Sequence, residues 1–530
     1  MRNKKLQVWL PLVFSLVMIA GMFFGFRLSS HTTGSFFARP SKTNIEEAFD
    51  IFKDRYVDNI NLDSLQNDAI NEMMNHLDPH STFIPASNLA SVNEDLAGSF
   101  EGGIGIEFNI FDDTVHILYV IPDGPSDKAG IRIGDKLIAV DGESVISKTL
   151  PSTDIRKMIR GKGGSKVNLT VIRGETTQYY EVLRGTIPIP SVDAAYMVNS
   201  QMGFIKLNKF SEPTYREFMT ALERLQKAGM KDLILDLRGN GGGYIDPAIE
   251  IADEFLDDDK LIVYTEGANV KRREYKAKRP GLFETGKLAI LIDEQTASAS
   301  EILTGALQDW DRATILGRRS FGKGLVQGQY TLSDGSAIRL TIARYYTPIG
   351  RSIQRPYDQG RKAYMEDIQN RYLHGEMFSA DSISHVNQKV FNTAGGRKVY
   401  GGGGITPDVF VPYDTSRFTK DVTQLYLDGR FNNIVYQYYI RNSGQLDKYK
   451  SPEDFSKNFN NIEAVWSELV QYALKDRINL RNIPERDKVN IQNQIKSYLA
   501  RLKWRTEGYY EVYNKYDPVV MKAVQTLGGR

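Results

Sequence analysis

The pattern of apolar and polar positions changes several times along the chain, and each change predicts a different kind of segment. A basic run at residues 1–5 precedes a largely apolar segment at residues 6–26. Its 21 residues suffice for a helix that crosses a bilayer and exceed the apolar region of a usual signal peptide. We therefore expect residues 1–27 to be a signal anchor or a signal peptide. The anchor is favoured over the signal peptide because no small-x-small cleavage pattern follows the apolar segment. The basic residues before it predict that the N-terminus stays inside and that the remaining chain is exported.

Two smaller regions come next. In residues 41–95, Ile45, Phe49 and Phe52 recur at helical spacing, which predicts a helical N-terminal region. In residues 96–186 the pattern changes to short β-prone runs separated by glycines and turn residues, with one helix expected near its middle. These patterns predict a helical segment followed by a small domain that is rich in β-strands.

Residues 187–415 alternate between short apolar strands and amphipathic helices, which predicts an α/β core with a largely parallel sheet. Within them, residues 355–396 show weak periodicity and are interpreted as an insertion of unknown purpose. Residues 416–530 have the pattern of helices, with Val465 and Leu469 on one apolar face, and predict a helical C-terminal domain. The chain is therefore expected to be a multidomain α/β protein.

Composition narrows the chemistry mainly by exclusion. The chain has 530 residues, a net charge of +2 and no cysteine, so disulfides, thiolate metal sites, a cysteine nucleophile and a lipidated cysteine are excluded. The balanced charge gives no reason to expect nucleic acid as a partner. His76 and His80 have the i, i+4 spacing of some metal sites, but Pro79 lies between them and argues against a continuous helix. We expect neither a metal nor a cofactor.

The candidate chemistry lies in residues 293–327. An apolar strand at 288–292 is followed by small hydroxyl residues and by a helix that begins at or near Ser298. Unpaired N–H groups and the helix dipole at such a terminus stabilise negative charge, as an alkoxide or an oxyanion requires. The alternative is structural, because Ser298 and Glu301 also have the spacing of a capping box.

A lysine follows in a position suited to catalysis. Lys323 lies between Gly322 and Gly324, and glycines allow a loop to lie close against neighbouring backbone. A lysine held in a dry pocket loses its proton more readily and can then act as a general base toward a serine hydroxyl. A second glycine run, residues 239–243, directly follows the strand expected at 233–237. It matches neither the phosphate-binding nor the dinucleotide-binding pattern.

The run TASASEILTGALQD at residues 296–309, followed by GKGLVQ at residues 322–327, resembles the carboxyl-terminal processing, or tail-specific, proteases of serine peptidase family S41. The resemblance implies that Ser298 is the nucleophile, Lys323 the base and Gln327 the residue that orients the lysine. Glu301 also matches the family pattern, whereas Ser300 does not have the required spacing. The resemblance further implies a crotonase-like β/α core of the kind found in Clp-type peptidases.

Two further groups of site residues come from the same resemblance. The oxyanion hole is assigned to the N–H of Ala299 together with that of Gly242 or Gly243, without a choice between the two glycines. The order of strands in residues 96–186 resembles a PDZ domain, which binds a C-terminal peptide as an added strand. Its carboxylate-binding loop then consists of Ile104, Gly105 and Ile106.

These observations together predict a serine endopeptidase that recognises protein tails through its PDZ domain. Its expected substrates are exported proteins or peptides with free, apolar C-termini, and an adaptor protein is a further candidate partner. The N-terminal segment predicts attachment to the inner membrane, with the catalytic body on the periplasmic side of a cell envelope. Two alternatives stay open, a catalytically silent PDZ scaffold and a crotonase-like acyl-CoA enzyme. The second is disfavoured because it requires neither a PDZ domain nor export.

Overall fold

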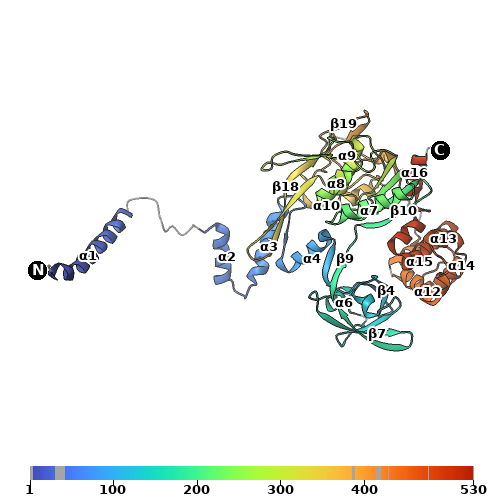
Figure 1. Ribbon diagram of the computed structural model, residues 1–530, viewed down its shortest axis with the longest axis horizontal. Helices are drawn as coiled ribbons and strands as arrows, with labels where there is room; N and C mark the ends of the chain where they lie inside the picture. The colour runs from blue at the N-terminus through green and yellow to red at the C-terminus, as the bar shows by residue number, and fades with distance from the viewer. Residues whose placement is uncertain are drawn as a thin grey trace. The chain divides into compact units, whose positions relative to one another are not determined.

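The computed structural model describes residues 4–29, 42–147, 149–384, 388–413, 419–427, 429–475 and 477–528, which Figure 1 colours along the chain. The chain divides into two compact units, residues 1–72 and 73–530. The first unit is helical, and three helices begin in it: α1 (Lys4–Ser29), α2 (Asn44–Arg55) and α3 (Leu62–Asn75). Thr43 caps α2 and forms a capping box with Glu46.

The described side chains of α1, residues 9–25, are exposed, and Phe14 keeps 69% of its surface accessible. Residues 1–3, which belong to the basic start of the chain, lie outside the described residues. Among the helices of the described residues, none meets the combined requirement of length and apolar character for a membrane crossing. The expected membrane segment at residues 6–26 is not supported by this finding and stays a prediction.

The β-rich region folds as the sequence predicts, around a sheet of order β3-β4-β5-β7-β8 with β6 paired to β5. Alternate positions of these strands are buried, including Val115, Ile117 and Val171, which are fully inaccessible. Strand β2 pairs separately with β9 at the exit of the domain. The elements are β2 (Ser99–Gly103), β3 (Ile106–Phe111), β4 (Thr114–Val120), α5 (Pro125–Ala129), β5 (Lys136–Val140), β6 (Glu143–Ser144), α6 (Ser152–Ile159), β7 (Lys166–Arg173), β8 (Thr176–Leu183) and β9 (Gly185–Pro188).

The α/β core contains the largely parallel sheet that its strand–helix alternation predicts. The sheet order is β10-β11-β12-β15-β16-β21, and only β10 runs antiparallel to its neighbour. Its strands and the helices between them are β10 (Val192–Met197), β11 (Met202–Leu207), α7 (Thr214–Lys227), β12 (Asp232–Asp236), α8 (Ile245–Asp253), β15 (Leu288–Ile292), α9 (Ala299–Asp309), β16 (Thr314–Gly317) and β21 (Val409–Phe410).

Successive side chains of a strand point to opposite sides of the sheet. Both sets of side chains are buried here, so both faces of the sheet are covered. Leu235 and Ile290 pack in one apolar cluster with residues of α7, α8 and α9. Ile234 and Leu291 pack in another cluster with Val520 and other residues of α16 (Pro518–Gly528). The last helix of the chain therefore covers one face of the core sheet, although the sequence assigns it to the C-terminal domain.

A second sheet has the order β1-β18-β13-β14, with β17 paired to β18. Strand β1 comes from the region ahead of the small β-rich domain and pairs with β18. The remaining elements of this part are β1 (Thr82–Ile84), α4 (Ala86–Ala97), β13 (Leu261–Glu266), β14 (Arg273–Lys276), β17 (Leu325–Thr331), β18 (Ala337–Tyr346), α10 (Gly360–Leu373), η1 (Ala380–Ser382), β19 (Val390–Asn392) and β20 (Lys398–Tyr400).

Helix α10 lies in the segment interpreted as an insertion of weak periodicity. Its buried residues, Tyr364 and Arg371, are polar, so burial in this helix does not follow the apolar pattern that sequence analysis uses. The C-terminal helices form their own apolar core, in which Val465 and Leu469 are fully buried as expected. These helices are α11 (Lys420–Leu427), α12 (Arg430–Leu446), α13 (Pro452–Asn458), α14 (Ile462–Lys475) and α15 (Glu485–Tyr513).

Candidate active site

The candidate site lies at the carboxyl ends of two adjacent strands. Strands β12 and β15 are parallel neighbours, and each is followed by one of the two stretches that sequence analysis selects. Residues 239–243 follow β12, and the turn that leads to α9 follows β15. Because the carboxyl ends of parallel strands meet at the same edge of a sheet, the two loops are brought together there.

Ser298 is the residue immediately before α9, and its backbone has φ +56° and ψ −117°. Few non-glycine residues adopt a positive φ, and such strained positions cluster at functional sites. Oε2 of Glu301 accepts the N–H of Ser298, as the spacing of a capping box predicts, and the N–H of Glu301 donates to the carbonyl of Ser298 at 2.8 Å. The structural and the functional interpretations of this pair are therefore compatible.

The Glu301 side chain is fully buried and connects the serine to the lysine loop. One carboxylate oxygen, Oε2, accepts the backbone N–H of both Ser298 and Lys323, each at 2.9 Å. The other, Oε1, accepts the N–H of Gly322 at 2.7 Å and the hydroxyl of Ser320 at 2.5 Å. Burial raises the pKa of Glu301 to about 7, although these donors favour the ionised form.

The Lys323 side chain is half-buried, and its Nζ donates to Oε1 of Gln327 at 3.0 Å. Burial lowers the pKa of Lys323 below its ordinary value, and the cation of Arg339 lowers it further, while the carboxylate of Glu301 opposes both. The hydroxyl of Tyr345 lies 3.1 Å from the carbonyl oxygen of Ser298 and 2.6 Å from that of Lys323. No sequence pattern singles out this tyrosine, and it links the two backbone segments directly.

Gln327 is held from its other end by His80, for which sequence analysis argues against the role of a metal ligand. Nε2 of Gln327 donates to the backbone carbonyl of His80 at 2.7 Å. The turn around His80 is held by Asp78, whose Oδ1 accepts the N–H of His80 at 2.8 Å and that of Ser81 at 2.9 Å. The His80 ring lies 2.7 Å from the hydroxyl of Tyr364 in α10. A turn signal is visible in the sequence at residues 77–83, but no signal there indicates the carbonyl contact.

The glycine loop approaches Ser298 more closely than any other residue type would allow. A side-chain carbon added to Gly242 (φ +93°) would lie 2.7 Å from Cβ of Ser298 and 2.9 Å from N of Ala299. A carbon added to Gly243 would lie 1.9 Å from the carbonyl oxygen of Phe210. Side-chain carbons do not approach other atoms this closely, which explains why two glycines follow one another here.

The backbone N–H groups of this loop differ in whether they already donate a hydrogen bond. The N–H of Gly242 donates to Oδ1 of Asn240 at 2.9 Å. Within the described part of the chain, neither the N–H of Gly243 nor that of Ala299 donates a hydrogen bond. Two unused donors are thus found next to Ser298, one from each loop.

A cavity of about 640 Å³ joins these parts. The serine turn, the lysine loop and the glycine run all contribute to its wall. Among the catalytic and oxyanion-hole residues that the sequence predicts, only the buried Glu301 does not reach its surface. The lining includes Ser298, Ala299, Lys323, Gln327, Gly242 and Gly243, together with Tyr345 and Arg339.

The three residues of the expected peptide-binding loop lie elsewhere, in the small β-rich domain, and do not line this cavity. Gly105 has φ +75°, and Ile104 and Gly105 use their carbonyls to accept the N–H of Ser126 and Ile121. Strand β3, which begins at Ile106, pairs only with β4 in the described sheet. In the ranges that the structure describes, no group of three or more His, Asp or Glu side chains has the arrangement of a metal site.

Comparison with known proteins finds family models that match three segments of the chain. Residues 201–359 match the model of peptidase family S41, residues 116–173 match that of a PDZ domain, and residues 422–505 match a family of unknown function. The core and the small domain thus define a serine peptidase with a PDZ domain.

Among curated proteins, the chain is 35% identical over 314 residues to a carboxy-terminal-processing protease of Bartonella bacilliformis, covering 58% of this chain and 71% of that protein. The chain belongs to this family, the carboxy-terminal-processing proteases of peptidase family S41. It is also 35% identical over 311 residues to a probable CtpA-like serine protease of Staphylococcus haemolyticus, covering 58% of this chain. The chain spans 62% of the length of that staphylococcal relative and 64% of one from Staphylococcus epidermidis. Among solved structures, a photosystem II D1 C-terminal processing protease is 28% identical, with a TM-score of 0.36, over 69% of this chain and 86% of that one.

Proposed function

We propose that this chain is a serine endopeptidase that uses Ser298 as nucleophile and Lys323 as general base. The observation that carries the proposal is the environment of the lysine amine. Lys323 lines the same cavity as Ser298, its Nζ is held by Gln327, and its pKa is lowered. A lysine of this kind is neutral in a larger fraction of molecules at neutral pH and can accept a proton.

In the proposed mechanism, Nζ of neutral Lys323 takes the hydroxyl proton of Ser298 as Oγ attacks the carbonyl carbon of the scissile bond. The negative charge that develops on the carbonyl oxygen is stabilised by backbone N–H groups. Collapse of this intermediate breaks the C–N bond, and the lysine returns the proton to the leaving nitrogen. An acyl-enzyme on Oγ is left, and a water molecule activated by Lys323 hydrolyses it.

For the oxyanion hole we favour the N–H of Gly243 together with that of Ala299. The N–H of Gly242 already donates to Asn240, and it would have to give up this hydrogen bond to serve a substrate. The loss of one such donor costs about 2.7–4 kcal/mol of transition-state stabilisation. A donor without a competing acceptor is therefore better suited to the role.

We further propose that the PDZ domain selects substrates by a free C-terminus with apolar final residues. The free edge of β3 and the loop at Gly105 support this assignment. An adaptor protein that presents substrates is part of the proposal.

The proposed location in a cell envelope rests on the basic start and the apolar segment at residues 6–26. It predicts that the full chain stays in the membrane fraction after a carbonate wash, and release into the wash would contradict it.

The proposed activity is tested with the full chain in mild detergent and an unstructured peptide that ends in apolar residues. The wild type should hydrolyse the peptide, and Ser298→Ala should bind it with unchanged affinity, measured by fluorescence anisotropy, without cleaving it. Ser200→Ala, at an exposed serine of the same core, is the matched control and should cleave normally. Cleavage by Ser298→Ala would refute the assignment, and binding without cleavage by the wild type would favour a silent scaffold.

A further inference from the structure

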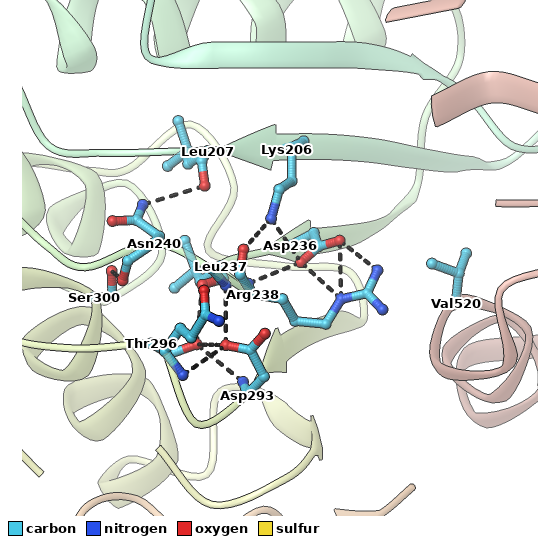
Figure 2. A network of polar contacts seen from close by, with 12 residues as sticks. Lys206, Leu207, Asp236, Leu237, Arg238, Asn240, Asp293, Thr296, Ser300 and Val520 are labelled. Carbon is cyan, nitrogen blue, oxygen red and sulfur yellow. Dashed lines mark hydrogen bonds and ion pairs between the residues drawn. The ribbon is translucent and has the colours of Figure 1, made fainter. Parts of the chain in front are cut away.

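The buried charges behind the glycine loop include one that comes from the far end of the chain. Asp236, the last residue of β12, is fully buried and pairs with the cations of Lys206 and Arg238. Figure 2 shows these three side chains converging beside the loop. The Arg238 guanidinium extends past Asp236 toward α16, where Val520 is labelled.

The partner of Arg238 on that side is Asp517. Nη1 of Arg238 lies 3.1 Å and 3.0 Å from the two carboxylate oxygens of Asp517, which is 5% exposed. Oδ1 of Asp517 also accepts the N–H of Val519 and Val520 at 2.9 Å and 3.0 Å, in the manner of a helix cap. The Asp517 carboxylate thus caps the N-terminus of α16 and also pairs with Arg238 in the charged cluster.

The charge balance of the cluster depends on Asp517. Lys206 and Arg238 supply two positive charges, and Asp236 and Asp517 supply two negative ones. Without Asp517 the cluster would hold an uncompensated buried cation, which is strongly unfavourable. Burial disfavours the cation of Arg238, but the two carboxylates raise its pKa well above the ordinary value.

The cluster is continuous with the loop that flanks Ser298. Arg238 directly precedes Gly239, whose N–H donates to Oδ1 of Asp293 at 2.9 Å. The carbonyl of Asn240 accepts the N–H of Ala297 and the hydroxyl of Ser300, each at 3.0 Å, and Figure 2 shows Asn240 beside Ser300. A displacement of Arg238 would therefore be transmitted through the glycine loop to Ala297 and Ser300, on either side of Ser298.

We propose that Asp517 is a positioning residue for the active site, and that α16 completes the peptidase core by holding the glycine loop at residues 239–243 through Arg238. The expected loss of kcat rests on the proposed function, whereas the expected effect on the glycine loop does not. It assigns an effect on the oxyanion hole, exerted through Arg238, to Asp517, which lies beyond the region that matches a family of unknown function.

The test compares three full-length variants. Asp517→Asn removes the charge but keeps an oxygen that can cap α16, because Asn and Asp are about equally good caps. Asp517→Glu keeps the charge. Lys287→Met is the matched control, since Nζ of Lys287 donates to the carbonyl of Leu527 at 2.6 Å and so ties α16 to the core elsewhere.

For Asp517→Asn we expect kcat to fall between about tenfold and a hundredfold with KM changed less than about twofold, since loss of a whole oxyanion donor costs about 10²–10³ in kcat. Asp517→Glu should recover most of this loss, and Lys287→Met should not show it. Rates are normalised to the folded fraction from near-ultraviolet circular dichroism. An unchanged kcat in Asp517→Asn, or an equal loss in Lys287→Met, would overturn the proposal.

Hydrogen exchange gives a readout that needs no activity. The hydrogen-bonded amides of Gly239 and Gly242 should exchange at least about tenfold faster in Asp517→Asn than in Lys287→Met. In the wild type, they should open in the same denaturant-dependent event as the amides of Val519 and Val520. Separate opening would overturn the inference even if Asp517→Asn does not fold. If the wild type cleaves no peptide, the proposed function fails while the exchange measurements still decide the role of Asp517.

Discussion

The side-chain amide of Gln327 donates a hydrogen bond to the backbone carbonyl of His80 at 2.7 Å. This contact fixes which end of the amide is the donor, so Oε1 must face the other way. There it accepts from Nζ of Lys323 at 3.0 Å. A neutral lysine that donates one N–H to this oxygen keeps its lone pair for the proton of Ser298. The turn at residues 78–81 therefore holds the proposed base in place through Gln327, although these residues do not line the cavity.

The first prediction concerns the charge of this orienting group. Gln327→Glu would place a carboxylate beside Lys323, and an adjacent opposite charge raises the pKa of a lysine. The rate at neutral pH should fall by about tenfold for each unit of the shift, and activity should recover at higher pH. The measurement is the pH dependence of kcat/KM. Thr331→Glu, at the exposed end of the same strand, is the control, and an unshifted profile in Gln327→Glu would contradict the proposed base.

The second prediction distinguishes a base from a simple cation. Lys323→Arg should be as inactive as Lys323→Ala, because arginine keeps its proton at every working pH. In the wild type, activity should increase with pH as Lys323 loses its proton below the ordinary lysine value of 10.5, since the pKa of Lys323 is lowered and only the neutral amine accepts a proton. Peptide hydrolysis between about pH 5 and 10 measures both effects. Substantial turnover by the arginine variant would exclude lysine as the base.

The third prediction links Glu301 to stability. Its pKa is raised from 4.5 to about 7, so the folded protein binds this proton more tightly than the unfolded chain does. The resulting stability is fully present below about pH 4.5 and is lost as the pH rises through about 7. The difference is about 3 kcal/mol, since one pKa unit corresponds to about 1.4 kcal/mol.

Glu301→Gln should remove this pH dependence from the free energy of unfolding, measured in denaturant at about pH 4.5 and about pH 8. The variant should also lose activity, because an amide cannot accept all of the hydrogen bonds that the two carboxylate oxygens accept from the Ser298 turn and the Lys323 loop. Equal pH dependence in the variant and the wild type would assign the effect to another group.

The fourth prediction concerns tail recognition. Gly105→Pro removes a backbone donor and cannot adopt φ +75°, so KM for a peptide with a free apolar C-terminus should rise at least about tenfold. Amidation of the peptide should have a similar effect on the wild type and little further effect on the variant. Gly142→Pro is the control, since Gly142 also has a positive φ, +85°, but lies at a turn of the same domain away from the loop. Equal cleavage of acid and amide peptides by the wild type would show that the domain does not read the carboxylate.

Much of the fold was predictable because it depends on local pattern. Buried parallel strands such as β12 and β15 appear as apolar runs, and the amphipathic face with Val465 and Leu469 predicts α14. The sequence pattern does not predict helix α10, because its buried residues Tyr364 and Arg371 are polar and are held by partners distant in sequence. Their burial follows from tertiary contacts, which a periodicity does not encode.

The chemical groups of the candidate site follow from the sequence alone. The order of Ser298, Glu301, Lys323 and Gln327, and the glycines at 242 and 243, are properties of short segments and of their resemblance to a family. The contacts that hold these groups in place depend on the tertiary fold. The contacts from Gln327 to the His80 turn and from Arg238 to the start of the last helix join residues separated by 247 and 279 positions. Backbone carbonyls carry no residue-specific signal, and a buried ion pair becomes recognisable only when the sheet and the last helix bring its two charges together.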